Sequence, residues 1–325
     1  MRFALTQQVF DEAPSTLDDL DRLLERVADE VHTLGIADGD AIEKSAWFKG
    51  MRPHRRDLVR NQIHAASYPA RGRVVHVGSD LPLEAAARLA FRPLLIAVEN
   101  KTNDGLLVEV AVRTHGDAET VRLWDARPKT GKAIDLVHGG GTGDLRKEVD
   151  RLIADASSAN LPMRAIVVTD GDARWPGEIA RKAAEIEAVC ATAKLPCVVL
   201  GCRAAENYIP DGALRRWADE PNNANVRGQV DTLLSLSSDQ RDHIRMKGSY
   251  GGLRDVDSRK EAAPPEQVAL FASVTAPARA KLVGFRDDII RLLREYINRP
   301  DPAEIAHRDP RGDLRKLVQM IEAEL

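Results

Sequence analysis

The chain has 325 residues, of which 43% are hydrophobic and 30% are charged, and its formal net charge is −3. A chain of this length suggests about two domains and can bury a large core, so it needs no disulfide or structural metal to fold. Its composition excludes a wholly disordered protein, and its charge excludes a protein that binds nucleic acid through bulk positive charge. A local basic face stays compatible with both conclusions.

Targeting and redox features are sparse. The sequence holds no apolar run near the roughly 20 residues that a membrane-spanning helix needs, so no membrane partner is expected. The first twelve residues lack the basic-then-apolar pattern of a signal peptide. Cys190, Cys197 and Cys202 cannot all pair with one another, and no histidine cluster accompanies them to suggest a zinc site. These features predict a cytoplasmic protein.

Residues 1–92 are expected to form a mainly helical N-terminal region. Ser15 and Asp18 resemble a capping box, and leucines and valines recur at helical spacing between residues 17 and 34. Four arginines between residues 52 and 60 lie in a second predicted helix, where they either contact phosphates or face solvent. A short strand is expected at 74–77 and a further helix at 83–91.

Residues 93–220 alternate between apolar strands and amphipathic helices, which predicts a parallel sheet with helical crossovers. The expected strands lie at 94–98, 121–124, 164–169 and 197–200. The expected helices begin near Leu106, after the glycine run at 139–143, and at Pro176. Residues 221–325 are expected to be mainly helical, with amphipathic helices at 289–296 and 314–321. The sequence therefore predicts an α/β fold, with a small parallel-sheet core between mainly helical N- and C-terminal regions.

Acidic residues follow two of the predicted core strands at their carboxyl ends. Glu99 comes directly after strand 94–98, and Asp170 and Asp172 come directly after strand 164–169. Open parallel sheets bind ligands at these ends, so the three carboxylates are expected to converge. Clustered carboxylates repel one another unless a cation relieves them, and oxygen ligands without histidine or thiolate favour Mg²⁺ or Mn²⁺. The pattern predicts metal-dependent phosphodiester chemistry; its alternative is a set of loop acids that cap helices.

In order and approximate spacing, these segments resemble the TOPRIM superfamily, in which a glutamate ends the first strand and Asp-x-Asp ends the third. The run Glu-Asn-Tyr-Ile-Pro that begins at Glu206 looks like a segment of stand-alone TOPRIM proteins. Those proteins are similar to the overcoming-lysogenization-defect nucleases and to DUF4435-type proteins associated with phage defence. The resemblance covers about residues 93–219.

The resemblance implies roles for individual residues. Glu99 would bind metal or act as general base, Asp170 and Asp172 would hold Mg²⁺ or Mn²⁺, and Glu206 would be an additional ligand. Lys247 is the candidate for a lysine beyond the core that stabilises charge developing on the phosphate. The alternatives to these roles are structural: the lysine would be an ordinary surface residue, and the Glu206 segment would brace the end of the sheet.

One turn departs from the family pattern. Many members have glycine after the glutamate and an acid four positions beyond it, whereas this chain has Asn100 and Asn103 there. Asp104 stands one step further along and would have to replace the missing acid. Tyr208 is the nearest residue for a covalent tyrosine intermediate of the topoisomerase kind, which is the less favoured variant.

Three hypotheses follow. The leading one is a Mg²⁺- or Mn²⁺-dependent nuclease that hydrolyses DNA or RNA, with a role in phage defence implied by the resemblance. The second is a non-catalytic TOPRIM-like subunit that binds a protein partner in a defence complex, which the unusual turn at Asn100 motivates. The third is an unrelated α/β phosphatase or phosphotransferase with Asp170 as its nucleophile. An oligomer is compatible with each of them.

Overall fold

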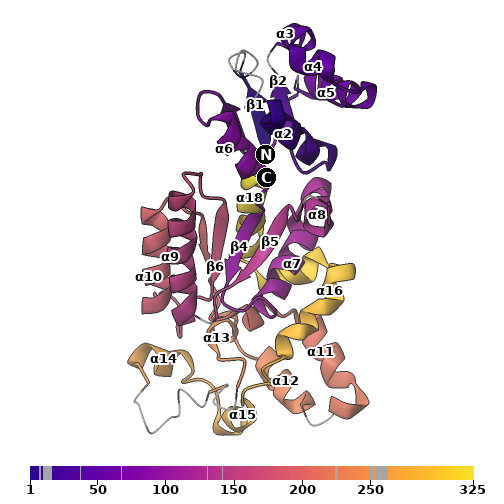
Figure 1. The fold of residues 1–325 in the computed structure, drawn as a ribbon. Coiled ribbons are helices and arrows are strands. Elements are labelled where there is room, and N and C mark those ends of the chain that lie inside the picture. Colours follow the sequence, from indigo (N-terminus) through magenta and orange to yellow (C-terminus); the bar gives the residue numbers. More distant parts are fainter. Residues whose placement is uncertain are drawn as a thin grey trace.

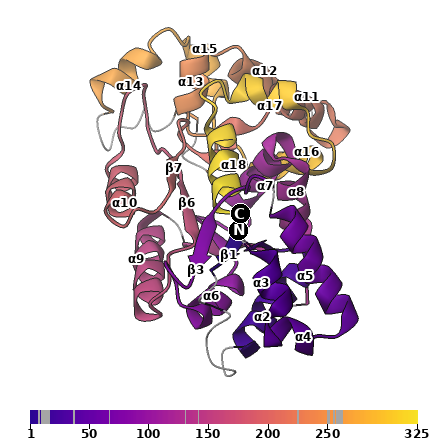
Figure 2. The same cartoon turned by 90° about the horizontal axis from the view of Figure 1, so that it is seen from above.

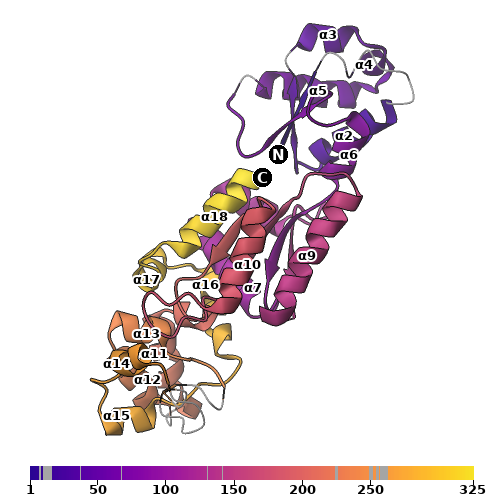
Figure 3. The same ribbon diagram turned by 90° about the vertical axis from the view of Figure 1, so that its left-hand side faces the viewer.

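Two separate parallel sheets organise the computed structural model, which describes residues 1–6, 9, 17–36, 38–66, 68–129, 131–140, 142–223, 226–248, 252–253, 256 and 263–325. An N-terminal α/β unit, a central α/β core and a C-terminal helical region follow one another along a long axis (Figures 1 and 3). The α/β fold class predicted from the sequence is confirmed. Among the described helices, none combines the length and apolar character needed to cross a membrane.

The N-terminal unit contains a three-stranded parallel sheet, of which the sequence predicts only the strand at 74–77. Its strand order is β2-β1-β3, with β1 at Arg2–Leu5, β2 at Thr33–Ile36 and β3 at Val74–Val77. Its helices are α2 (Leu17–Ala28), α3 (Gly39–Lys44), α4 (Ala46–Gly50), α5 (Pro53–Ala65) and α6 (Leu83–Ala90). The region is thus mostly helical by residue, but a parallel sheet forms its centre.

The first predicted helix ends earlier than its apolar spacing suggests. Glu30 has φ +56°, a left-handed conformation that breaks the helix after α2. Leu34 continues the helical spacing, yet it lies in β2 and pairs with Phe3 of β1. Tertiary pairing therefore overrides local periodicity here. Ser15 and its expected capping box lie outside the described residues.

The central sheet has the order β5-β4-β6-β7, and all its strands are parallel. The strands are β4 (Leu94–Val98), β5 (Ile134–His138), β6 (Ala165–Thr169) and β7 (Cys197–Val199). The strand expected at 121–124 is wrong, because those residues lie in α8 (Ala118–Asp125), whose first turn is capped by the Asp117 side chain. The actual second strand is β5, an edge strand whose polar residues interrupt the apolar run.

Helices cover both faces of the central sheet (Figure 2). Ala97 and Val167 face α9 (Thr142–Ser158) and α10 (Arg181–Thr192), whereas Ile96 and Val98 face α7 (Asp104–His115) and α18 (Asp313–Glu324). Burial on both faces explains why β4 and β6 read as continuous apolar runs. The helix expected from Pro176 begins five residues later, at the start of α10.

From residue 221 onward the described chain is mainly helical, as expected. Its elements are η3 (Pro221–Asn223), α12 (Arg227–Leu234), α13 (Ser238–His243), α14 (Pro265–Leu270), α15 (Ala276–Lys281), η4 (Ile289–Leu293), α16 (Arg294–Asn298) and α17 (Pro302–Arg308). Two further helical elements, η2 (Ala205–Tyr208) and α11 (Asp211–Asp219), precede it in the segment predicted to belong to the core. The last helix, α18, returns to the core and packs against α7 and β7. The core therefore needs a segment that lies far beyond the expected boundary at residue 220.

Candidate acidic site

The carboxyl ends of β4 and β6 bring Glu99 and Asp170 together. The two strands are neighbours in register, with Ala97 opposite Val167, so the residues that follow them leave the sheet side by side. Glu99 Oε1 accepts hydrogen bonds from Thr169 Oγ1 at 3.0 Å and from the Asp170 backbone N–H at 3.3 Å. Both acids are buried, and each has 9% of its surface exposed. Strand topology alone thus places these two carboxylates at one edge.

The turn after Glu99 adds a third acid, Asp104. The Asn100 side chain accepts hydrogen bonds from the backbone N–H groups of Thr102 (2.9 Å) and Asn103 (3.1 Å), which builds a tight turn before α7. Asp104, the first residue of α7, folds back so that its Oδ2 accepts from the Asn100 N–H at 2.7 Å. Asp104 is buried and acts electrostatically on Asp170. Although this turn departs from the family pattern, it therefore still brings an acid to this edge of the sheet.

Glu206 and Lys247 enter the same cluster from beyond the core. Glu206 lies in η2 and is fully buried; its Oε1 accepts a hydrogen bond from Lys247 Nζ at 2.9 Å. Its Oε2 is buried and has no hydrogen-bond partner among the described residues. Asp170 Oδ1 accepts from the Ala205 N–H at 2.9 Å, which ties η2 to the end of β6. We name Glu99, Asp104, Asp170 and Glu206 the acidic cluster.

Asn207 positions the segment that carries Lys247, a role that sequence reasoning missed. Its Nδ2 donates to the carbonyl groups of Arg241 at 2.8 Å and Ile244 at 2.9 Å. The backbone oxygen of Asn207 accepts from Arg308, which also pairs with buried Asp242. The sequence held one indication of this role, which is that Asn207 directly follows the candidate ligand Glu206. A buried polar network thus fixes both ends of the Lys247–Glu206 contact.

Asp172 lies apart from the acidic cluster. Its side chain is exposed, its φ is +50°, and its N–H donates to the Arg203 carbonyl at 2.8 Å. Gly171 permits this path, because a Cβ there would lie 2.3 Å from the Leu200 carbonyl oxygen. The structure therefore brings Glu99, Asp170, Glu206 and Lys247 together and leaves Asp172 at the rim.

Burial and crowding of like charges perturb the titration of Asp104 and Asp170. Burial raises the pKa of Asp104 to about 6, against the lowering effect of its hydrogen bond from Asn100. Burial also raises the pKa of Asp170 well above its usual range, and the neighbouring carboxylates raise it further. Burial alone would lower the pKa of Lys247, but its contact with Glu206 gives a net rise. The cluster thus favours bound protons or an added cation.

Replacement of Asp104 tests this electrostatic strain. The folded-state pKa of Asp104 is about 6 and its ordinary value is 3.8, so the folded protein binds more protons across this window and loses stability as pH rises through it. Without divalent ions, we expect Asp104→Asn to raise the free energy of unfolding by about 2–3 kcal/mol at about pH 8. The gain should vanish below about pH 3.5, where both states are protonated. Urea unfolding in EDTA measures it, and destabilisation at the higher pH would contradict it.

Thr169 offers a second test, because its hydroxyl holds Glu99 in place. Thr169→Val keeps the shape of this buried side chain but removes the 3.0 Å hydrogen bond to Glu99 Oε1. Groups that orient a metal ligand typically contribute about 10–100-fold in affinity, so we expect Mn²⁺ binding to weaken about tenfold. Calorimetric titration with Mn²⁺ measures the change. Unaltered affinity would show that the orientation of Glu99 does not matter for cation binding.

The donor set of the acidic cluster fits a hard divalent cation. All its ligands are carboxylate oxygens, and the orphaned Oε2 of Glu206 is a buried acceptor of the kind that a cation would satisfy. Within the described ranges, however, no three acidic, histidine or cysteine side chains already stand in a shared coordination geometry. Cation binding would therefore require side-chain movements that draw the carboxylates together.

Other predicted features do not join the acidic cluster. Tyr208 is buried and donates its hydroxyl to Asp313 Oδ2 at 2.6 Å, which braces the start of α18. Gly139 follows β5 at the same sheet edge and packs closely on Leu145, while Gly141 lies outside the described residues. In the basic segment of α5, Arg55 and Arg60 pair with acids of the N-terminal unit. This segment lies in the N-terminal unit and not at the carboxyl ends of β4 and β6 (Figure 1).

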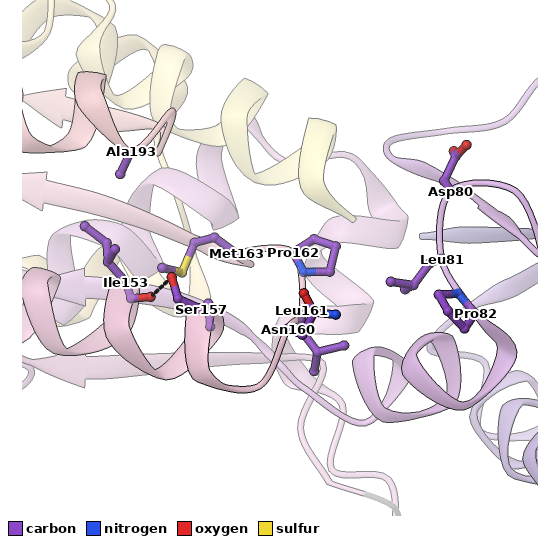
Figure 4. A pocket seen from close by; sticks show the side chains of 11 residues that line it. Asp80, Leu81, Pro82, Ile153, Ser157, Asn160, Leu161, Pro162, Met163 and Ala193 are labelled. Atoms are coloured by element: carbon purple, nitrogen blue, oxygen red, sulfur yellow. Dashed lines mark hydrogen bonds between the residues drawn. The ribbon is translucent and has the colours of Figure 1, made fainter.

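Cavities with defined walls lie elsewhere in the molecule. One of about 590 Å³ lies between the N-terminal unit and the core, with Leu81 and Pro82 on the side of the N-terminal unit and Leu161 and Pro162 nearest to them on the side of the core (Figure 4). Others of about 840, 430 and 480 Å³ also have no member of the acidic cluster in their walls. The acidic cluster is thus a buried polar edge rather than the floor of one of these cavities.

Comparison with protein-family models, curated proteins and solved structures gave no match to this chain.

Proposed function

We propose that the chain is a divalent-metal-dependent nuclease, using Mg²⁺ or Mn²⁺ to hydrolyse phosphodiester bonds of DNA or RNA. The observation that carries the proposal is the convergence of Glu99, Asp170 and Glu206 with Lys247, from four distant segments, at one sheet edge. Four buried acids beside one lysine carry excess negative charge, which a divalent cation would relieve. Burying charged groups is costly unless they are compensated, which favours a cation at this edge.

The residues divide the work by position. Glu99 and Asp170 are fixed at the strand ends and would hold the cation, with Asp104 and Glu206 near enough to share it. A bound Mg²⁺ or Mn²⁺ polarises phosphate oxygens and makes water a better nucleophile. Lys247, whose side chain is 40% exposed, can donate from the solvent side to the charge that develops on phosphorus. Asp172 is exposed at the rim and is not assigned a role in holding the cation.

A cleavage assay tests the proposal directly. The full chain is incubated with supercoiled plasmid, single-stranded DNA and tRNA, with Mg²⁺, with Mn²⁺ or with EDTA. We expect cleavage of at least one substrate that depends on added metal. Cleavage that persists in EDTA, or that is equal in wild type and Asp170→Asn, would overturn the mechanism.

A non-catalytic binding subunit is the second candidate, and the burial of the acidic cluster favours it. All four acids are at most 9% exposed, so a phosphodiester could reach them only after movement around Lys247. The turn at Asn100 no longer supports this candidate, because it delivers Asp104 to the cluster. Nucleic-acid or partner binding that is retained without any metal-dependent cleavage would favour the binding subunit over the nuclease.

A further inference from the structure

A buried arginine lies at the opposite end of the strands that carry the acidic cluster. Arg164 directly precedes β6 and is only 4% exposed. Its Nη1 donates to the Arg92 carbonyl oxygen, but Nε and Nη2 are buried with no hydrogen-bond partner among the described residues. A guanidinium has five N–H donors, and burying several of them without hydrogen-bond partners costs free energy. The strand itself does not explain this arrangement.

The charges around Arg164 do not neutralise it. Arg26 and Arg73 act on it with the same sign, and Glu324 is the opposing charge that acts on it most strongly. Glu324 is already paired with Arg73 at 3.1 Å. Burial lowers the pKa of Arg164 to about 9, so the guanidinium stays charged at neutral pH. The junction between the N-terminal unit and the core thus keeps an excess of buried positive charge.

Arg164 lines a cavity of about 430 Å³, which is within the range of small-molecule sites. Arg92 and Arg151 line the same cavity, and its one acidic wall residue, Asp155, is paired with Arg151. The remaining wall is largely apolar and includes Pro93, Leu95, Leu152, Ala156, Pro162 and Met163. Cationic and apolar walls in one cavity suit a ligand that has an anionic end and an apolar body.

We propose that this cavity binds a phosphate monoester with a ring-bearing body, of the chemical class of a nucleoside monophosphate. The phosphate would accept hydrogen bonds from Arg164 and from Arg92 or Arg151, because guanidinium groups match phosphate oxygens in a forked geometry. The ring would lie on the apolar wall near Pro162 and Met163. Small rearrangement of the groups covering Arg164 accompanies binding, since its free nitrogens are enclosed.

This site is separate from the acidic cluster. Arg164 stands before the first residue of β6 and Asp170 after the last, so the five-residue strand holds them roughly 16–20 Å apart. The cavity also borders the 590 Å³ space of Figure 4, with which it shares Ala156, Pro162 and Met163. Binding of the monophosphate requires neither a divalent cation nor the proposed nuclease activity.

Calorimetric titration of the full chain in EDTA tests the site. Adenosine monophosphate, inorganic phosphate and adenosine are titrated separately into wild type, Arg164→Gln, Arg151→Gln and Arg146→Gln. We expect the monophosphate to bind, inorganic phosphate to bind at least tenfold more weakly, and adenosine to show no binding. Arg164→Gln should weaken the monophosphate at least tenfold and Arg151→Gln about threefold, because exposed Arg151 already has acidic partners. Arg146, an exposed arginine elsewhere on α9, is the matched control and should leave affinity unchanged.

The outcomes separate cleanly. Absence of monophosphate binding to wild type, or equal affinity in a folded Arg164→Gln variant, overturns the proposal. If circular dichroism shows that Arg164→Gln does not fold, Arg92→Gln replaces it, because the Arg92 side chain is only partly buried. At least fivefold weaker binding in Arg92→Gln then supports the site, and unchanged binding overturns it. An Asp170→Asn variant should bind the monophosphate as wild type does.

Discussion

Asp170→Asn is expected to abolish metal-dependent cleavage, with a fall in rate of at least about 10³-fold. Asp170 is the acid that connects the cluster: it follows β6, contacts Glu99 through its backbone N–H, and is held by the Ala205 N–H through its side chain. The asparagine keeps the shape and the hydrogen bond to Ala205 but removes the negative charge that a divalent cation needs. The cleavage rate is measured on the substrate that the wild-type protein cleaves, once with saturating Mg²⁺ and once with saturating Mn²⁺.

The stability of Asp170→Asn should not fall together with its cleavage rate. Because burial raises the pKa of Asp170 well above its usual range, a neutral side chain suits the metal-free fold, and Asp170→Asn should be no less stable than wild type in EDTA. Asp150→Asn, an exposed aspartate paired with Arg146 on α9, is the control and should keep full activity. Asp172→Asn should lose only about tenfold, as expected of a residue at the rim. Comparable loss in Asp172→Asn and Asp170→Asn would show that Asp172 turns into the cluster when metal binds.

Lys247→Met should lower turnover about 10²–10³-fold while divalent-metal binding is retained or strengthened. Lys247 contacts Glu206 at 2.9 Å and is the positive charge that most directly opposes the acidic cluster. Methionine preserves much of the apolar stem but removes the donor that would face the developing charge on phosphorus. Removal of a positive charge also makes the cluster more attractive to a cation, so turnover and metal affinity should change in opposite directions.

A structural role for Lys247 would have a different pattern. Lys247→Met leaves the buried Glu206 without its cation, so some stability should be lost, and Glu206→Gln in the same chain should restore it. Turnover should stay low in this double variant if Lys247 acts on the substrate. Recovery of turnover together with stability would show that Lys247 serves only to neutralise Glu206. Lys147→Met, an exposed lysine paired with Asp144, controls for loss of surface charge.

Strong local patterns were sufficient for strands that are buried on both faces and for a helix with a regular apolar stripe. The runs that form β4 and β6 are continuously apolar, and the helix α18 has a regular apolar stripe, so all three could be predicted from sequence. The edge strand β5 gave no such pattern, although the edge strands β3 and β7 were predicted. Residues 121–124 are as apolar as a strand, but the Asp117 cap and the packing of Leu123 place them in α8.

By itself, the sequence determined the α/β class and the positions of Glu99 and Asp170, because side chains that end neighbouring parallel strands must emerge at the same edge. Only the tertiary structure decided which further groups meet them. The turn at Asn100 delivers Asp104, and Asn207 anchors the distant segment of Lys247, while the left-handed backbone at Asp172 turns that acid outward. The anchoring of Lys247 and the path of Asp172 depend on contacts between residues 31 to 41 positions apart, which no local spacing encodes.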